Sequence, residues 1–174
     1  MDAIFKRRSI RKYTSEPVSE EMVEKVLRAG MAAPTAGNAQ EWEFILFEDS
    51  LIKKKIKEVH EYATALDTAP IGILVCADLE REVYPGEGWW IQDMSAVMQN
   101  MLIAAAELGL GSLWLGIYPR EERVAGMKEL FGLPEHVMPL GIITLGYAVK
   151  EKDAIERYDV SRVHWENYQN SYNK

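Results

Sequence analysis

The first stretch whose side chains are suited to chemistry is basic. Lys6 to Lys12 reads KRRSIRK, so five of the chain's 20 lysines and arginines lie within seven positions. An arginine guanidinium is a planar set of N–H donors that matches phosphate oxygens, and a serine hydroxyl can add a further donor. Two interpretations remain open here: a solvated basic face, or a site for one small anion.

The second stretch is a loop of small residues, Ala32 to Trp42, that carries the amides Asn38 and Gln40. Small side chains allow a flat ligand to approach the backbone, and amide groups can both donate and accept hydrogen bonds toward it. Pro34 and Gly37 are equally compatible with a plain surface loop, so that alternative also stays open.

The sequence does not support other kinds of site. Gly109-Leu110-Gly111 follows an expected helix and precedes an expected strand, the reverse of the order in a dinucleotide-binding fingerprint. His60, His136 and His164 lack the spacing of metal ligands and a pattern of cysteines or carboxylates around them. We therefore predict no metal site and no catalytic acid, base or nucleophile. If the protein is an enzyme, a bound cofactor carries the reaction.

The element expected to organise the fold is a helix over residues 92–108, ended by Gly109. Its apolar residues recur at steps of three and four, and beyond Asn100 they occupy the other sides as well. A helix that is apolar all round is expected to be buried all round, unless a second subunit covers part of it. A buried strand from Ser112 to Tyr118 is expected to follow.

The remaining elements alternate around this helix. We expect helices over residues 2–6, 19–30, 50–66 and 119–131, and strands over residues 43–48, 70–77 and 137–148. Residues 78–88 form an expected loop, and Trp89 and Trp90, just ahead of the central helix, are either core or the wall of a pocket. From Lys150 the chain is irregular and aromatic, which favours a tail lying across another surface, such as a partner subunit.

Length and composition indicate one domain, and the absence of apolar segments bears on its location. A chain of 174 residues with 48% apolar and 27% charged residues can bury a sizeable core. Because no apolar run reaches about 18 residues and the charged N-terminus lacks a signal-peptide core, we expect a cytoplasmic protein without membrane attachment. The net charge of −7 disfavours nucleic acid as a partner. A nucleic-acid binder that used residues 6–12 would show strongly salt-dependent binding.

Four segments, taken in order, resemble the FMN-dependent nitroreductase family. Arg7 to Arg11 (RRSIR) is similar to its N-terminal R-x-S-x-R/K element, and Ala33 to Trp42 (APTAGNAQEW) to its A-P-S-x-x-N-x-Q-P-W loop. Residues 92–116 resemble its buried helix and Gly-Leu-Gly strand. In the tail, Arg157 and His164-Trp165 resemble a C-terminal basic element followed by an aromatic pair.

The resemblance implies an α+β fold, a three-layer α-β-α sandwich with a mixed central sheet. It implies a single domain, residues 1–174, whose tail from about residue 150 packs on the partner subunit of a homodimer. FMN would lie at the subunit interface, with NADH or NADPH as reductant and a small-molecule electron acceptor as second substrate.

The family's FMN contacts can be carried over residue by residue. Arg7, Ser9 and Arg157 match phosphate-binding positions, with Arg8 beside them. Arg11 and Asn38 match groups at the pyrimidine edge of the flavin. The full set of expected cofactor-binding residues is Arg7, Arg8, Ser9, Arg11, Pro34, Thr35, Asn38, Gln40, Leu115, Gly116 and Arg157.

Three features depart from the family pattern. Glu41 stands where the family usually has the proline before Trp42, and it adds a negative charge beside the expected site. The chain is short, so insertions that form substrate lids in larger relatives are missing or reduced. Arg162 is a rival to Arg157 for the phosphate contact.

The resulting hypothesis is an FMN-dependent NAD(P)H oxidoreductase that reduces a nitroaromatic, a quinone or another flavin in alternating half-reactions. One alternative is a flavin reductase of an enone or a halogenated aromatic on the same scaffold, and another is a non-enzymatic flavin-binding protein. The acceptor, the nicotinamide preference and the choice between one- and two-electron chemistry stay open.

Overall fold

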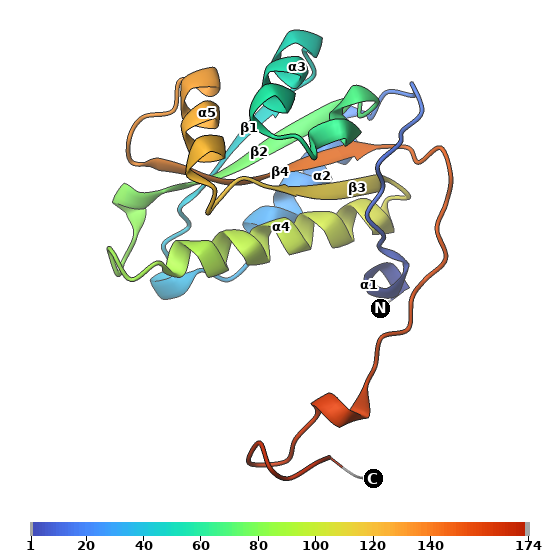
Figure 1. Ribbon diagram of the computed structural model, residues 1–174, viewed down its shortest axis with the longest axis vertical. Coiled ribbons are helices and arrows are strands. Elements are labelled where there is room, and N and C mark those ends of the chain that lie inside the picture. The colour runs from blue at the N-terminus through green and yellow to red at the C-terminus, as the bar shows by residue number, and fades with distance from the viewer. Residues whose placement is uncertain (1, 173–174) are drawn as a thin grey trace.

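The computed structural model describes residues 2–172 and has a four-stranded sheet at its centre (Figure 1). The strands lie in the order β1-β2-β4-β3, and every neighbouring pair is antiparallel. Their bounds are β1 Trp42–Phe47, β2 Ile71–Asp78, β3 Gly111–Gly116 and β4 Val137–Gly146. The α+β class is confirmed, but the sheet of one chain is antiparallel where a mixed sheet was expected. Parallel pairing within residues 2–172 is a single bridge between Ser9 and Ser112, because the N-terminal segment meets the edge of β3 at one residue.

Two pairs of helices cover the two faces of this sheet (Figure 1). α2 (Glu20–Met31) and α4 (Trp89–Glu107) lie on one face, and α3 (Ser50–Val59) and α5 (Glu121–Phe131) lie on the other. Successive side chains of a strand point to opposite faces, so Ile73 and Val75 pack under α2 and α4 while Leu74 and Cys76 pack under α3 and α5. The predicted three-layer sandwich is therefore confirmed.

The long helix α4 has 19 residues and begins at Trp89, so both tryptophans belong to its first turn instead of preceding it. Met94, Met98 and Met101 are fully buried in the core. Further along, residues 103, 104 and 106 are only half-buried. The expected burial on all sides is not reached within one chain, because the sheet and α2 cover only part of the circumference of the helix.

The helix boundaries follow local conformation. Ser19 caps α2 as predicted, accepting a hydrogen bond from the N–H of Met22. α3 ends at Val59 and not near residue 66, because His60 leaves the helical conformation with φ −136° and ψ 85°. A separate 3₁₀ turn, η2 (Ala63–Asp67), follows it. Three more such turns, η1 (Ala36–Asn38), η3 (Leu79–Arg81) and η4 (Val160–Arg162), lie in the loops and the tail.

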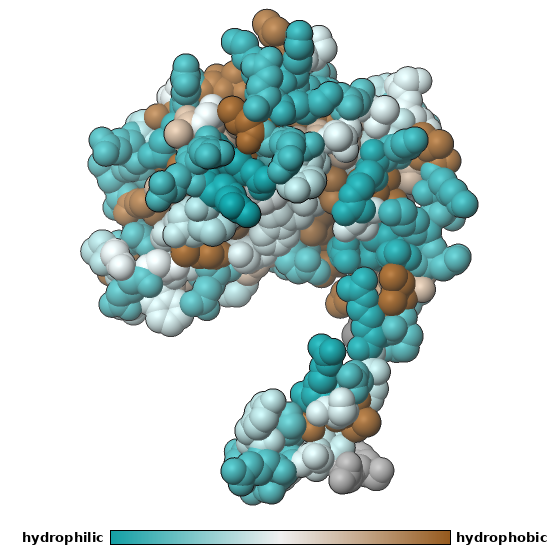
Figure 2. Space-filling model, viewed as in Figure 1, coloured by the Kyte–Doolittle hydropathy of each residue, from teal (hydrophilic) through white to brown (hydrophobic). Residues whose placement is uncertain are grey.

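The two ends of the chain meet beside α4 and then separate. The predicted first helix is present as α1 (Asp2–Lys6), which packs against α4. The tail starts beside this segment and then extends away from the body as an arm (Figure 1). Figure 2 shows the arm as largely hydrophilic, with isolated hydrophobic residues. Trp165 is 60% exposed and Tyr168 84% exposed, so the end of the arm does not lie across its own chain.

Across residues 2–172, no helix combines the length and the apolar character needed to cross a bilayer.

Candidate functional site

The basic segment is held at the edge of the sheet beside the C-terminal end of α4. The N–H of Ile10 donates to the carbonyl of Ser112 at 2.9 Å, and Ile10 itself is buried. A Cβ atom on Gly111 would lie only 3.0 Å from the Ile10 side chain, so the close approach depends on glycine at that position. This contact at the start of β3 fixes the position of the backbone from which the arginine side chains before and after Ile10 extend.

Arg157 from the tail joins the same end of the molecule. A hollow of about 290 Å³ is lined by Ile4, Phe5, Arg7, Arg8, Ile155, Glu156, Arg157 and Tyr158. The start of the tail is tied to the segment, because Lys152 donates to the carbonyl of Ser9 at 2.8 Å and Arg8 donates to the carbonyl of Asp153. Arg162 instead pairs with Asp159, the residue that caps η4, and does not line this hollow. The structure thus places Arg157, and not its rival, beside Arg7 and Arg8.

The side chains of this basic end are available to a ligand. Within residues 2–172, the guanidinium groups of Arg7, Arg11 and Arg157 make no ion pair. An adjoining groove of about 410 Å³ runs along Arg7, Arg8, Ser112 and Lys152. Arg7 and Arg157 are positively charged donors without an ion-pair partner among residues 2–172, and such donors are what a phosphate group needs.

The amide loop is organised by its own hydrogen bonds. Thr35 accepts from the N–H of Asn38 through its carbonyl and from the N–H of Gln40 through its hydroxyl, both at 3.0 Å. The side-chain amide of Gln40 donates to that of Asn38 at 2.9 Å. Gly37, Asn38 and Gln40 have positive φ values of 61°, 58° and 52°. This backbone points the amides outward while the loop holds its own shape.

The last predicted segment is the end of β3. Leu115 is buried, whereas a Cβ atom on Gly116 would meet no atom within 4 Å. The carbonyl of Gly116 accepts from Arg123 at 2.9 Å, which anchors the strand end. The backbone here is therefore open on one side and can be approached closely by a flat ligand.

The predicted residues form two groups that one chain does not bring together. The basic end lies by the C-terminus of α4, and the amide loop is bound to its first turns, where Asp93 accepts from the N–H of Ala36 at 2.8 Å. A helix of 19 residues is about 28 Å long. Figure 1 shows α1 at one end of α4 and the loop before β1 near the other.

Two buried carboxyls lie behind the amide loop. Glu41 is 1% exposed and Asp93 is 8% exposed, and both line the same small hollow. Burial, with the negative charges of Asp93 and Glu82 nearby, raises the pKa of Glu41 to about 7. The sequence identified Glu41 as a charge beside the site but did not indicate its burial. It gave no role to Asp93, although that residue lies in a segment used for the resemblance.

The sequence left open whether Trp89 and Trp90 belong to the core or form the wall of a pocket, and the structure places the two differently. Trp90 is 7% exposed and packs edge-on against Tyr118, with ring centroids 4.9 Å apart, so it belongs to the core. Trp89 is 40% exposed, and its indole donates to Glu87 at 2.8 Å. Both also line a small hollow together with Glu41 and Asp93.

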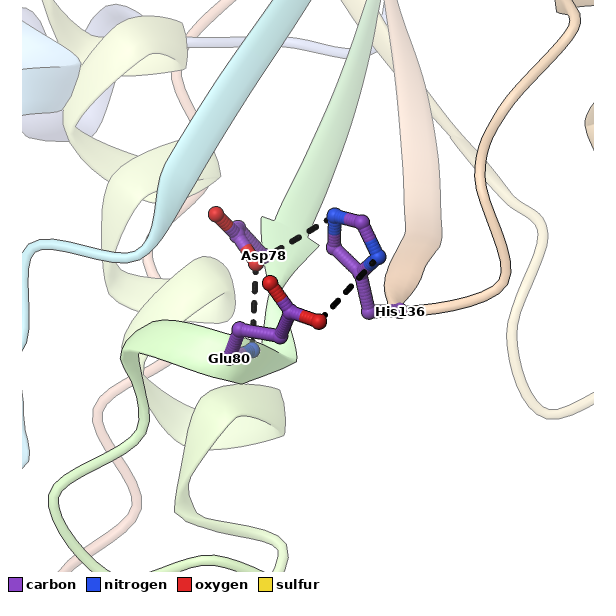
Figure 3. A group of neighbouring side chains, drawn as sticks. All are labelled: Asp78, Glu80 and His136. Carbon is purple, nitrogen blue, oxygen red and sulfur yellow. Dashed lines mark hydrogen bonds and ion pairs between the residues drawn. The ribbon is translucent and has the colours of Figure 1, made fainter.

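A second polar cluster lies at the far end of β2, outside the predicted site (Figure 3). His136 faces two carboxylates, with Nε2 3.9 Å from Asp78 and Nδ1 3.7 Å from Glu80. The sequence suggested no carboxylates around the histidines; the antiparallel pairing of β2 with β4 brings them there, because Asp78 is opposite Val137. The two nitrogens point to different carboxylates, and Asp78 also pairs with Arg81, so the cluster is a polar clamp between η3 and the start of β4.

Comparison with known proteins identifies the family. The model of the nitroreductase family matches residues 4–64 and 57–147. A candidate NADH dehydrogenase/NAD(P)H nitroreductase of Archaeoglobus fulgidus is 44% identical over 168 residues, covering 95% of this chain and 96% of the relative. The chain therefore belongs to the nitroreductase family.

Solved structures agree with this assignment. The crystal structure of a candidate NADH oxidase from Clostridium acetobutylicum has a TM-score of 0.91 and 45% identity, covering 96% of this chain and all of that one. An FMN-dependent nitroreductase from Clostridium difficile has a TM-score of 0.87 and 30% identity, covering 97% of this chain and all of that one.

Proposed function

We propose that this protein is an FMN-dependent NAD(P)H oxidoreductase. The observation that carries the proposal is the pairing of an uncommitted cationic end with a rigid amide loop in a chain of this family. Arg7, Ser9 and Arg157 would hold the phosphate, and Arg11 and Asn38 the pyrimidine edge. When bound, the flavin supplies the hydride chemistry; the protein holds the ring, orients it and excludes water.

We infer that a homodimer is needed to complete the site. The basic end and the amide loop of one chain are separated by about the length of α4, roughly 28 Å. Two chains packed with their α4 helices in opposite directions would set the basic end of each against the amide loop of the other. The half-buried side of α4 and the exposed aromatic residues of the arm are surfaces that a second copy would cover.

The same arrangement favours a reaction in two half-reactions. A nicotinamide would reduce the flavin and leave, and a nitroaromatic, quinone or flavin acceptor would then occupy the same open face. No acidic or basic side chain of the expected set has to act on either substrate. The open side of Gly116 is the face that either molecule would approach.

The test is anaerobic reduction of the purified protein loaded with FMN. We expect NADH or NADPH to bleach the absorption of the oxidised flavin, and a panel of nitroaromatics, quinones and free flavins to restore it. A protein that binds FMN yet is reduced by neither nicotinamide would be a flavin-binding protein without this activity. A protein with no affinity for FMN would contradict the proposal.

A further inference from the structure

The amide loop is fastened to α4 through one carboxylate. Asp93 accepts the N–H of Ala36, the first residue of η1, at 2.8 Å. Three of the four residues that follow Ala36, namely Gly37, Asn38 and Gln40, have the left-handed conformation, so their placement depends on how this turn begins. The position of Thr35, Asn38 and Gln40 is therefore sensitive to the state of Asp93.

Asp93 in turn lies against Glu41. The Glu41 carboxyl is buried, and its Oε2 has no hydrogen-bond partner within residues 2–172. The charged groups that act on it are Asp93 from α4 and Glu82 from the loop after η3, both acidic, and Tyr84 of that loop lines the same hollow. The hollow measures about 10 Å³, room for about one water molecule, so an ionised pair could not be well hydrated.

The Glu41 carboxyl keeps its proton in such a place. Ionising it would put a second negative charge beside Asp93 where little water can screen the pair, so the proton is held until the pH is high enough to remove it. The protonated carboxyl can donate a hydrogen bond to the other, which remains an acceptor for Ala36.

We propose that Glu41 is a positioning residue, whose carboxyl proton bridges to Asp93 and so keeps the amide loop in the conformation that binds flavin. The inference rests on the proposed function for its consequence, because it concerns the loop that would hold FMN. The bridge itself is a property of the chain without any ligand.

The direction of the pH dependence follows from the pKa of Glu41. It is about 7 with the loop in place, compared with an ordinary value of 4.5 when the carboxyl is solvated. The ordered loop therefore binds the extra proton. The contribution of this proton to the stability of the ordered loop is fully present below pH 4.5 and is lost as the pH rises to about 7. The change is limited to about tenfold in the equilibrium per pH unit, since one proton is involved.

The first measurement needs no cofactor. Hydrogen exchange of the Ala36 amide, corrected for its intrinsic rate, is measured at pH 5.5 and pH 8 for the wild type and for Glu41→Gln. We expect protection to fall severalfold at the higher pH in the wild type and to stay constant in E41Q, whose amide is neutral and still donates. Equal behaviour of the two proteins would overturn the proposal.

The second measurement is the FMN dissociation constant over the same pH range. The phosphate of FMN also titrates, so the ratio of wild type to E41Q isolates Glu41, and we expect this ratio to rise with pH. Asp93→Asn offers an independent variant, because asparagine accepts from Ala36 and can donate to ionised Glu41. Burial still acts on Glu41 in this variant, so its pH dependence should be weaker than that of the wild type but not absent. A pH-dependent loop in a protein that does not bind FMN would support the bridge and reject the function, whereas FMN binding with the same pH profile in all three proteins would reject the bridge alone.

Discussion

The two ends of α4 are built on different physical principles. At the basic end, the guanidinium groups of Arg7, Arg11 and Arg157 make no ion pair within residues 2–172, and few hydrogen bonds hold the tail that supplies one of them. At the amide end, Thr35 and Asp93 satisfy the backbone of the loop, and left-handed residues fix its shape. The basic end carries positive charges without ion-pair partners, and the amide end has a backbone conformation that is fixed before any ligand binds. Binding should depend on electrostatics at the first and on backbone geometry at the second.

The largest effect expected from this comparison concerns which chain supplies each end. Arg7→Ala and Asn38→Ala should each weaken FMN binding in a homodimer. When the two variants are co-expressed with different tags and the mixed dimer is purified, a site shared between chains gives one doubly altered site and one wild-type site. We expect tight binding of FMN to be restored at half the sites.

FMN binding to the mixed dimer would also show if the site is not shared between chains. If both residues of a site came from one chain, each site of the mixed dimer would still carry one substitution, and no tight binding would return. Each variant purified alone provides the control for folding and for residual affinity.

Most of the fold could be predicted from the sequence, because hydrophobic period and capping residues are local signals. Ser19 is an example of a cap that was identified correctly. The early end of α3 was missed, since nothing in the residues around His60 marks a helix end before η2. The tryptophans at the start of α4 were also placed outside the helix, because no side-chain cap precedes Trp89 and Gly88 opens the helix with φ 78°.

The site was predictable by residue type but not by distance. Motif order placed Arg157 with Arg7, and the structure brings them to one hollow. That the amide loop lies at the other end of α4 depends on how the loop packs against that helix, which no spacing reveals. The burial of Glu41 is likewise a tertiary effect, since an isolated glutamate before a strand is normally exposed.

At the basic end, the choice between the two tail arginines gives the next largest effect. Arg157→Ala should weaken FMN binding about ten- to hundredfold, the range of a charge-assisted hydrogen bond. Arg162→Ala is the matched control and should change the dissociation constant by less than about twofold, because its guanidinium pairs with Asp159. Isothermal titration with FMN and with riboflavin, which lacks the phosphate, checks this: riboflavin should not distinguish the variants. A larger loss in R162A than in R157A would reverse the assignment.

The amide end allows a test of backbone geometry by itself. Gly37 and Gly86 both have positive φ, 61° and 83°, so an alanine at either position carries the strain of the left-handed region, about 1 kcal/mol. They differ in space: a Cβ atom at Gly37 would lie 2.8 Å from Val83, and one at Gly86 would meet nothing within 4 Å. Gly37→Ala should therefore lower the free energy of unfolding by about 1–2 kcal/mol more than Gly86→Ala, measured by urea denaturation. If the two substitutions cost the same, the loop moves away from Val83 at no cost, and the amide end is not a preformed surface.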